Sequence, residues 1–129
     1  MAVLQTGPGP LMAAFLIREA NGMYRSREEA DVSVGANTAL EPGTLLGRVT
    51  ASGVYVRHAP GATDGSQNVA GILFEGIPAK DATQTARRTV VVRDCEVHKT
   101  ELIYSAGANA AAITAADTAL RALGIIPRL

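Results

Sequence analysis

Residues 45–57 carry the sequence LLGRVTASGVYVR, which predicts a β-hairpin. Two short segments rich in Leu, Val and Tyr, 45–50 and 54–57, flank the three residues Ala-Ser-Gly. A loop of this length suits a hairpin when glycine occupies the position that needs a left-handed backbone, and Gly53 stands at that position. The hairpin therefore indicates a domain built from short strands and tight turns.

Further β signals follow at short intervals. Residues 70–74 predict a buried strand, and residues 89–93, with the sequence TVVVR, have the strongest β signal because their middle is β-branched. The polar segment 78–85 is predicted to be a loop. Residues 95–104 are compatible with a strand or with a short turn of helix.

The end of the chain predicts an α-helix. Asn109 is a good N-cap, and Gly124 stands where a glycine commonly follows a helix. The apolar face of this helix comprises Ile113, Ala116, Leu120 and Leu123. The opposite, polar face comprises Thr114, Asp117, Thr118 and Arg121, with Asp117 and Arg121 spaced as an ion pair. Beyond the helix, residues 125–126 are expected to return to the core before Pro127 ends the strand.

Together these segments predict an α+β fold, a small antiparallel β-barrel or sandwich with a C-terminal helix. Residues 1–38 are predicted to form an extended N-terminal arm, and residues 39–129 the β-rich domain. The arm contains the apolar run 11–17 and the turn signal Asn21-Gly22.

Charge and hydropathy exclude several classes of protein. Twelve Lys and Arg residues balance twelve Asp and Glu residues, so the chain lacks the positive field of a general nucleic-acid binder. The longest apolar run, 11–17, is far below the roughly 18 residues that span a bilayer. No basic residue precedes it, as a secretory signal would require. We therefore expect a soluble, non-secreted chain with no membrane or nucleic-acid partner.

The only chemically suggestive spacing is that of Cys95 and His98. A zinc site needs three or four ligands, so His58 or scattered carboxylates would have to complete it. A catalytic Cys–His pair needs a third group, and Asp94 would point to the opposite face of a strand from Cys95. We expect no catalytic, cofactor or metal site and no enzyme activity. A metalloprotein or enzyme built on Cys95 and His98 stays open as an alternative. A small β-barrel module that binds another protein or a carbohydrate is a second alternative.

The order of parts along the chain resembles that of a known family. A Pro-Gly turn at 42–43 precedes the hairpin, and a Thr-Asp-Gly loop at 63–65 precedes the segment VAGIL at 69–73. Residues 90–97 and 123–126 complete the pattern. Over residues 17–126 the chain resembles the head decoration proteins of tailed phages, the family typified by the lambda protein.

The resemblance implies a structural role. Proteins of this family have a small β-tulip-like domain and stand as homotrimers on the local three-fold positions of the expanded capsid. There they clamp the major capsid protein on the outer surface of the virion head, after synthesis in the host cytoplasm. An N-terminal arm that adds to sheets of the capsid protein is part of this pattern.

Six residues of the predicted arm suit such docking: Phe15, Leu16, Ile17, Tyr24, Arg25 and Arg27. An alternative is that residues 15–17 pack on their own domain as a first strand.

Overall fold

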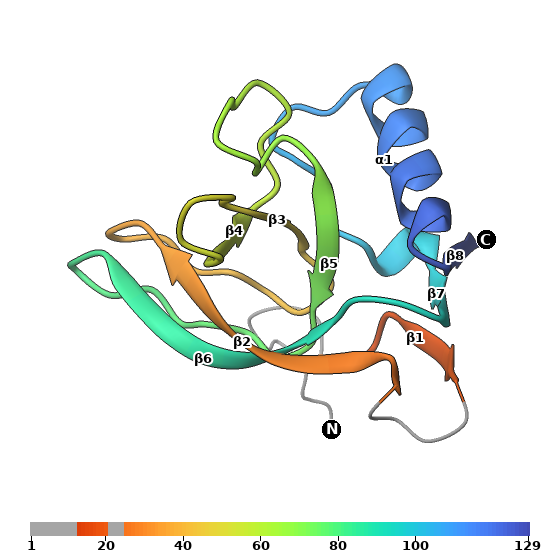
Figure 1. The fold of residues 1–129 in the computed structure, drawn as a ribbon, viewed down its shortest axis with the longest axis horizontal. Helices are drawn as coiled ribbons and strands as arrows, with labels where there is room; N and C mark the ends of the chain where they lie inside the picture. Colours follow the sequence, from red (N-terminus) through yellow and green to blue (C-terminus); the bar gives the residue numbers. More distant parts are fainter. Residues whose placement is uncertain (1–12, 21–24) are drawn as a thin grey trace, which may run out of the picture.

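The computed structural model describes residues 13–20 and 25–129 (Figure 1). Within these ranges the strands are β1 Leu16–Glu19, β2 Arg27–Val34, β3 Leu45–Arg48, β4 Tyr55–Arg57, β5 Val69–Leu73, β6 Gln84–Val91, β7 Cys95–His98 and β8 Ile125–Arg128. A short 3-10 helix covers Lys99–Glu101, and the α-helix α1 covers Ala110–Ala122.

Five strands close into a barrel in the order β2-β4-β3-β5-β6. The two longest strands, β2 and β6, run antiparallel along their whole length and close the barrel (Figure 1). The remaining pairs are antiparallel except that of β2 with β4, which is parallel and consists of Val32 opposite Tyr55.

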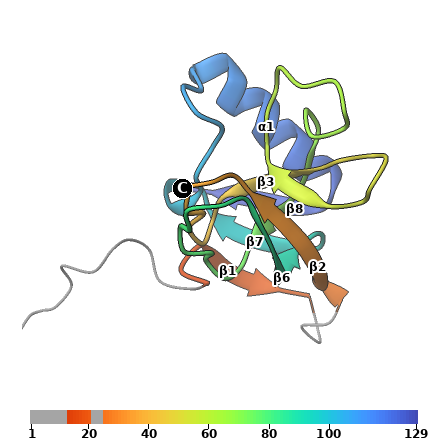
Figure 2. The same ribbon diagram turned by 90° about the vertical axis from the view of Figure 1, so that its left-hand side faces the viewer.

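A second sheet has the order β1-β7-β8, with β1 antiparallel and β8 parallel to β7 (Figure 2). Helix α1 packs against β8 and β5, so it joins this sheet to the barrel. The predicted α+β class, a small barrel with a C-terminal helix, is confirmed.

The molecule has two apolar clusters. The cluster inside the barrel is formed by Ala30, Val32, Val34, Leu40, Leu46, Tyr55, Leu73, Ile77, Val90 and Val92. The cluster between the barrel, the second sheet and α1 is formed by Phe15, Leu45, Val69, Ile72, Val91, Cys95, Val97, Leu102, Ala116, Leu120 and Ile125. Phe15, only 1% exposed, is the largest side chain of the second cluster, so the segment before β1 belongs to the core.

The predicted hairpin is confirmed, since β3 pairs with β4 and Gly53 has a φ of 76°. The loop predicted at 78–85 is shorter than expected, because β6 begins at Gln84. Residues 84–88, which precede the predicted strand, alternate between the two faces of the barrel wall and pair with β2. A strand rich in polar residues is hard to predict from its own sequence, because its stability comes from pairing with a neighbouring strand, here β2.

The limits of α1 are as predicted. The Asn109 side chain accepts a hydrogen bond from the backbone N–H of Ala112 at 2.9 Å, and Gly124 follows the helix with a φ of 83°. Asp117 differs from the expectation, because it is buried, and the ion pair that the structure describes joins it to Lys99 rather than to Arg121. Lys99 lies on the 3-10 helix that follows β7, which is why helical spacing within α1 did not reveal this partner.

Residues 95–104, for which two structures were open, contain both a strand and a helical turn, namely β7 and the 3-10 helix. The strand after α1 continues through Pro127, which was expected to end it. Since β8 lies at the edge of its sheet, one of its sides needs no hydrogen-bond donors there, and proline is tolerated.

The range 1–38 was predicted to be an extended arm. Where the structure describes it, this range contains β1 and β2, and β2 is a wall of the barrel. The turn expected at Asn21-Gly22 lies outside the described residues. Among the helices that are described, none has the length and apolar character needed to cross a membrane.

Candidate functional site

The residues expected to dock on a partner gather at β1 and at the start of β2. Phe15 is buried, and its backbone carbonyl accepts a hydrogen bond from the N–H of His98 at 2.7 Å. Leu16 is half-buried against the second apolar cluster. Ile17 is 42% exposed, an unusual exposure for a large apolar side chain in this structure. Accordingly Phe15 supports the domain, whereas Ile17 is available to a partner.

A β-bulge explains the exposure of Ile17. The register of β1 with β7 shifts between Leu16, which faces Val97, and Arg18, which faces Glu96. A bulge puts an extra residue on one strand and re-aims the side chains beside it. Ile17 and Arg18 are both exposed as a result, although strand residues normally alternate.

Arg27 ties β2 to β1. Its guanidinium donates two hydrogen bonds to the Glu19 carboxylate, both at 2.7 Å, and lies 4.2 Å above the ring of Phe74. Phe74 in turn meets Phe15 edge to face, with ring centroids 6.4 Å apart. The bond to Glu19 raises the pKa of Arg27, and the charge of Glu19 adds to this while burial opposes it. Arg27 therefore holds β1 in place, a role that requires the side chain to stay on its own domain.

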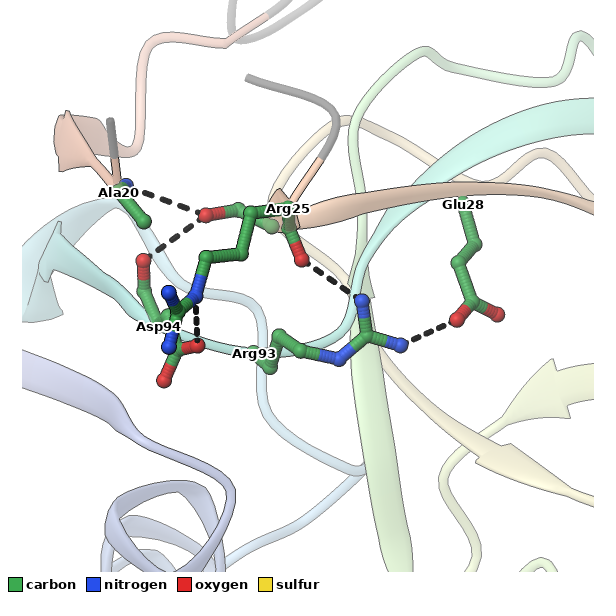
Figure 3. A network of polar contacts seen from close by, with 6 residues as sticks. Ala20, Arg25, Glu28, Arg93 and Asp94 are labelled. Carbon is green, nitrogen blue, oxygen red and sulfur yellow. Dashed lines mark hydrogen bonds and ion pairs between the residues drawn. The ribbon is translucent and has the colours of Figure 1, made fainter. Parts of the chain in front are cut away.

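Asp94 connects the two sides of the segment 21–24 (Figure 3). Its backbone carbonyl accepts hydrogen bonds from the N–H of Ala20 at 3.0 Å and from the hydroxyl of Ser26 at 2.8 Å. Its carboxylate pairs with Arg25 at 2.9 Å. Asp94 has a φ of 51°, and this left-handed backbone turns the chain from β6 into β7. The start of β2 and the end of β1 are thereby fixed to the same turn.

Arg93 extends the network onto β2. Its guanidinium donates to the backbone carbonyl of Arg25 at 2.7 Å and pairs with the carboxylate of Glu28 (Figure 3). The side chains of Arg25, Glu28 and Arg93 are all partly open to solvent, so each pair contributes little stability alone. Arg25 is the most exposed of the three side chains. Tyr24 lies outside the described residues.

Among the described residues, strand β1 has a neighbour on one side only, because it stands at the edge of the order β1-β7-β8. An edge strand offers unpaired backbone groups to a strand of another chain. The geometry therefore provides a short β edge, the exposed apolar side chain of Ile17 and the adjacent cations of Arg18 and Arg25.

Cys95 and His98 do not form a reactive pair. Cys95 is buried, whereas His98 is exposed. Burial raises the pKa of the Cys95 thiol to about 12, and the carboxylates of Glu19, Asp94 and Glu96 add to the increase. A thiol with this pKa stays protonated at neutral pH and is a poor nucleophile. Across residues 13–20 and 25–129, no three His, Cys, Asp or Glu side chains are grouped so as to hold a metal ion.

An exposed strand edge beside an exposed apolar side chain is a feature through which proteins bind other proteins. The family model for Bacteriophage lambda head decoration protein D matches residues 5–125, and the chain belongs to this family. No curated protein sequence matches the chain. The protein is therefore a structural component of a phage capsid. Its family is not known for enzymes.

Sequence reasoning missed the residues that hold the site together. Ser26 is fully buried, and Asp94 turns the backbone, but the sequence did not single out either side chain as a candidate site residue. Glu19 lies within the range predicted to be an extended arm, and no pattern indicated that it pairs with Arg27. The alternation of apolar and polar residues in 30–34 was an available signal, because it is typical of a strand with one buried face.

Proposed function

We propose that this chain decorates the expanded phage capsid as a homotrimer at local three-fold positions and stabilises the shell. In this proposal its N-terminal segment docks on the major capsid protein, on the outer surface of the head. The family supports the capsid role, and the edge position of β1 with exposed Ile17 is the observation that supports the docking.

The docking segment in this proposal consists of residues 1–12, together with the outward side of β1. Residues 11–12 are Leu and Met, which continue the apolar character of Ile17 toward the start of the chain. Phe15 and Arg27 are assigned a supporting role, because their contacts lie within the domain. Arg25 and Tyr24 remain candidate contacts with the capsid.

Trimer formation makes such docking effective. Fixing a segment on a partner costs about 1–2 kcal/mol of backbone entropy per residue, so a single short segment binds weakly. Three segments on one trimer act at high effective concentration, which strengthens binding without new contacts. Capsid binding is therefore expected to depend on contacts between copies as well as on the segment itself.

The test is co-sedimentation with undecorated capsids of the source phage, both expanded and unexpanded. We expect saturable binding to the expanded shell alone, near one copy per capsid subunit. A variant lacking residues 1–12 is expected to keep its melting temperature and lose binding. This deletion is preferable to removal of residues 1–20, which also takes away buried Phe15 and β1.

Two outcomes contradict the proposal at different points. Full binding by the shortened chain shows that residues 1–12 do not dock. Absence of binding by the full chain to either form of the capsid removes the decoration role itself.

A further inference from the structure

One end of the barrel opens into a hollow of about 550 Å³, which we call the barrel mouth. It lies where β2, β4 and β5 begin and where β3 and β6 end, because the pairing of these strands brings those ends together. Val69, Ala70 and Leu123 give the mouth an apolar wall, and charged side chains line the rest of it. The mouths of β-barrels are among the places where proteins bind ligands.

The hydroxyl of Tyr55 points into the barrel mouth. Tyr55 is only 7% exposed, and its ring belongs to the apolar cluster inside the barrel. Burial raises the pKa of its hydroxyl, the positive charges of Arg48 and Arg93 lower it, and the charge of Glu28 raises it further. These three residues line the mouth, so the hydroxyl on which they act faces it. Unlike the hydroxyl of Tyr104, it has no hydrogen-bond partner among the described residues.

Arg48 brings a positive charge to the same place. It lies directly opposite Tyr55 in the pairing of β3 with β4. Its Nε donates a hydrogen bond to the carbonyl oxygen of Gly53 at 3.2 Å, and the centre of its guanidinium lies 5.8 Å from the centre of the Tyr55 ring. Arg48 takes part in none of the ion pairs between described residues. A hydroxyl donor and a guanidinium without a counter-ion therefore stand side by side.

The other charged groups of the barrel mouth are already paired. Arg93 pairs with Glu28, and Asp94 pairs with Arg25 (Figure 3). Together with Arg48 these groups comprise three cations and two carboxylates, which leaves one positive charge. A single carboxylate neutralises that charge. A phosphate, with a charge of about −1.5 to −2, would leave negative charge beside the two carboxylates already present.

We propose that the barrel mouth binds a peptide segment of another protein through one acidic side chain, whose carboxylate accepts hydrogen bonds from the Tyr55 hydroxyl and the Arg48 guanidinium. A carboxylate has two acceptor oxygens, so it serves both donors at once. The apolar wall at Leu123 suits an apolar residue beside the acidic one. A run of acidic residues is disfavoured, because Glu29 and Asp31 line the neighbouring hollow that shares Arg48 and Tyr55 with the mouth. This inference goes beyond the proposed function, since it requires neither the capsid nor residues 1–12.

A titration of the full chain followed by nuclear magnetic resonance tests the site. The probe is the blocked dipeptide acetyl-Glu-Leu-amide, and acetyl-Gln-Leu-amide is the matched peptide without the charge. We expect the first peptide to shift the Nε–H signal of Arg48 saturably, with a Kd on the order of 1 mM. The second should bind at least about tenfold more weakly, because it loses hydrogen bonds to a charged group. Inorganic phosphate, titrated in the same way, should bind more weakly than acetyl-Glu-Leu-amide.

Two variants identify the donors. Tyr55→Phe removes the hydroxyl and keeps the ring in the barrel, whereas Arg48→Gln removes the charge at an exposed position that the core does not need. We expect each to weaken binding of acetyl-Glu-Leu-amide by roughly tenfold, the effect of one hydrogen bond to a charged group. For Arg48→Gln, the backbone signal of Tyr55 reports the binding. Arg121→Gln is the control, because it removes the same charge from an exposed position on α1 that does not line the mouth.

Several results would overturn the inference. Equal binding of the two peptides, or no shift at Arg48 with either, shows that the mouth does not recognise a carboxylate. Wild-type binding by both Tyr55→Phe and Arg48→Gln shows that these side chains are not the donors. Tighter binding of phosphate than of acetyl-Glu-Leu-amide shows a site for a free anion in place of an acidic side chain. None of these results bears on the proposed function, because capsid binding is measured separately.

Discussion

At the turn between β6 and β7, Gly124 lies directly against Asp94. Gly124 has a φ of 83°, and an added Cβ atom would lie 2.7 Å from the Asp94 carboxylate oxygen. We expect Gly124→Ala to lower the free energy of unfolding by about 1–2 kcal/mol, since a left-handed backbone disfavours any side chain. Urea denaturation measures the change. Gly61→Ala is the control, because nothing lies within 4 Å of its added Cβ and no left-handed φ is required there. Equal losses in both variants would contradict the assignment.

The pair of Arg27 and Glu19 is largely buried and bidentate, which distinguishes it from the exposed ion pairs of the same molecule. Lysine at position 27 keeps the charge but loses the two-fold hydrogen bonding and the flat contact with Phe74. We expect Arg27→Lys to cost about 1–2 kcal/mol in thermal or urea unfolding. Arg87→Lys at the exposed pair with Asp31 should cost less than about 0.5 kcal/mol. A similar loss of stability in Arg27→Lys and Arg87→Lys would contradict the idea that the buried ion pair contributes more than the exposed one.

The buried thiol of Cys95 predicts a loss of stability at alkaline pH. Its pKa is raised from about 9 to about 12 on folding, so between these values the folded state holds the proton that the unfolded state releases. Stability is therefore complete below about pH 9 and falls as the pH rises toward 12. We expect urea unfolding from pH 8 to 11 to show a smaller decline for Cys95→Ala than for the wild type. Tyr55 and Tyr104, whose pKa values are also raised mainly by burial, contribute equally to both curves. Parallel curves would contradict the role of Cys95.

At the scale of elements, one buried carboxylate adds polar contacts to the apolar packing that holds α1 on the rest of the molecule. Asp117 is 5% exposed and accepts a hydrogen bond from the Tyr104 hydroxyl at 2.5 Å. Its other oxygen pairs with Lys99 at 2.8 Å. Both partners lie outside the helix, so this side chain fixes the segment between β7 and α1.

We expect Asp117→Ala to lower the free energy of unfolding by about 2–3 kcal/mol, because two partners lose a charged acceptor at once. Urea denaturation followed by circular dichroism gives the value. Thr118→Ala on the exposed side of the same helix is the control and should change stability by less than about 0.5 kcal/mol. A loss below 1 kcal/mol for Asp117→Ala would contradict the fastening role.

At the scale of the whole molecule, the segment 15–17 has a buried residue that supports the core and an exposed residue close to it. Phe15 lies in the core shared by the barrel, the second sheet and α1, whereas Ile17 points outward beside it. We expect Phe15→Ala to cost about 3–5 kcal/mol of stability, a large part of the usual total for a domain.

Ile17→Ala is expected to leave stability within about 0.5 kcal/mol of the wild type, because the side chain is exposed. In the proposed function the same variant weakens binding to expanded capsids. Thermal unfolding and co-sedimentation of the two variants give both readings. If neither variant binds expanded capsids more weakly than the wild type, or if both are destabilised equally, Phe15 and Ile17 do not have the separate roles proposed here.

Local chemistry alone determined several elements of this protein. The β3–β4 hairpin, the N-cap at Asn109 and the turn after α1 at Gly124 were predicted from the sequence and are confirmed. Each depends on a few neighbouring residues, namely a loop glycine, a capping side chain or a glycine with positive φ. The α+β class follows from the same signals, because the strands are short and a single amphipathic helix comes last.

Only the tertiary structure decided where β1 and β2 lie in the fold and how the site is arranged. β2 and the first half of β6 are strands because they pair with each other, although the paired residues are 50 or more positions apart in the sequence, as Val34 and Gln84 are. The partners Arg27 with Phe74, Asp94 with Ser26 and Asp117 with Lys99 are likewise distant or lie on different elements. A sequence pattern indicates whether a side chain is buried or exposed. It does not indicate which distant residue that side chain contacts, because such contacts form only when the barrel closes. The physical reason is that closure brings together groups whose separation along the chain carries no local signal.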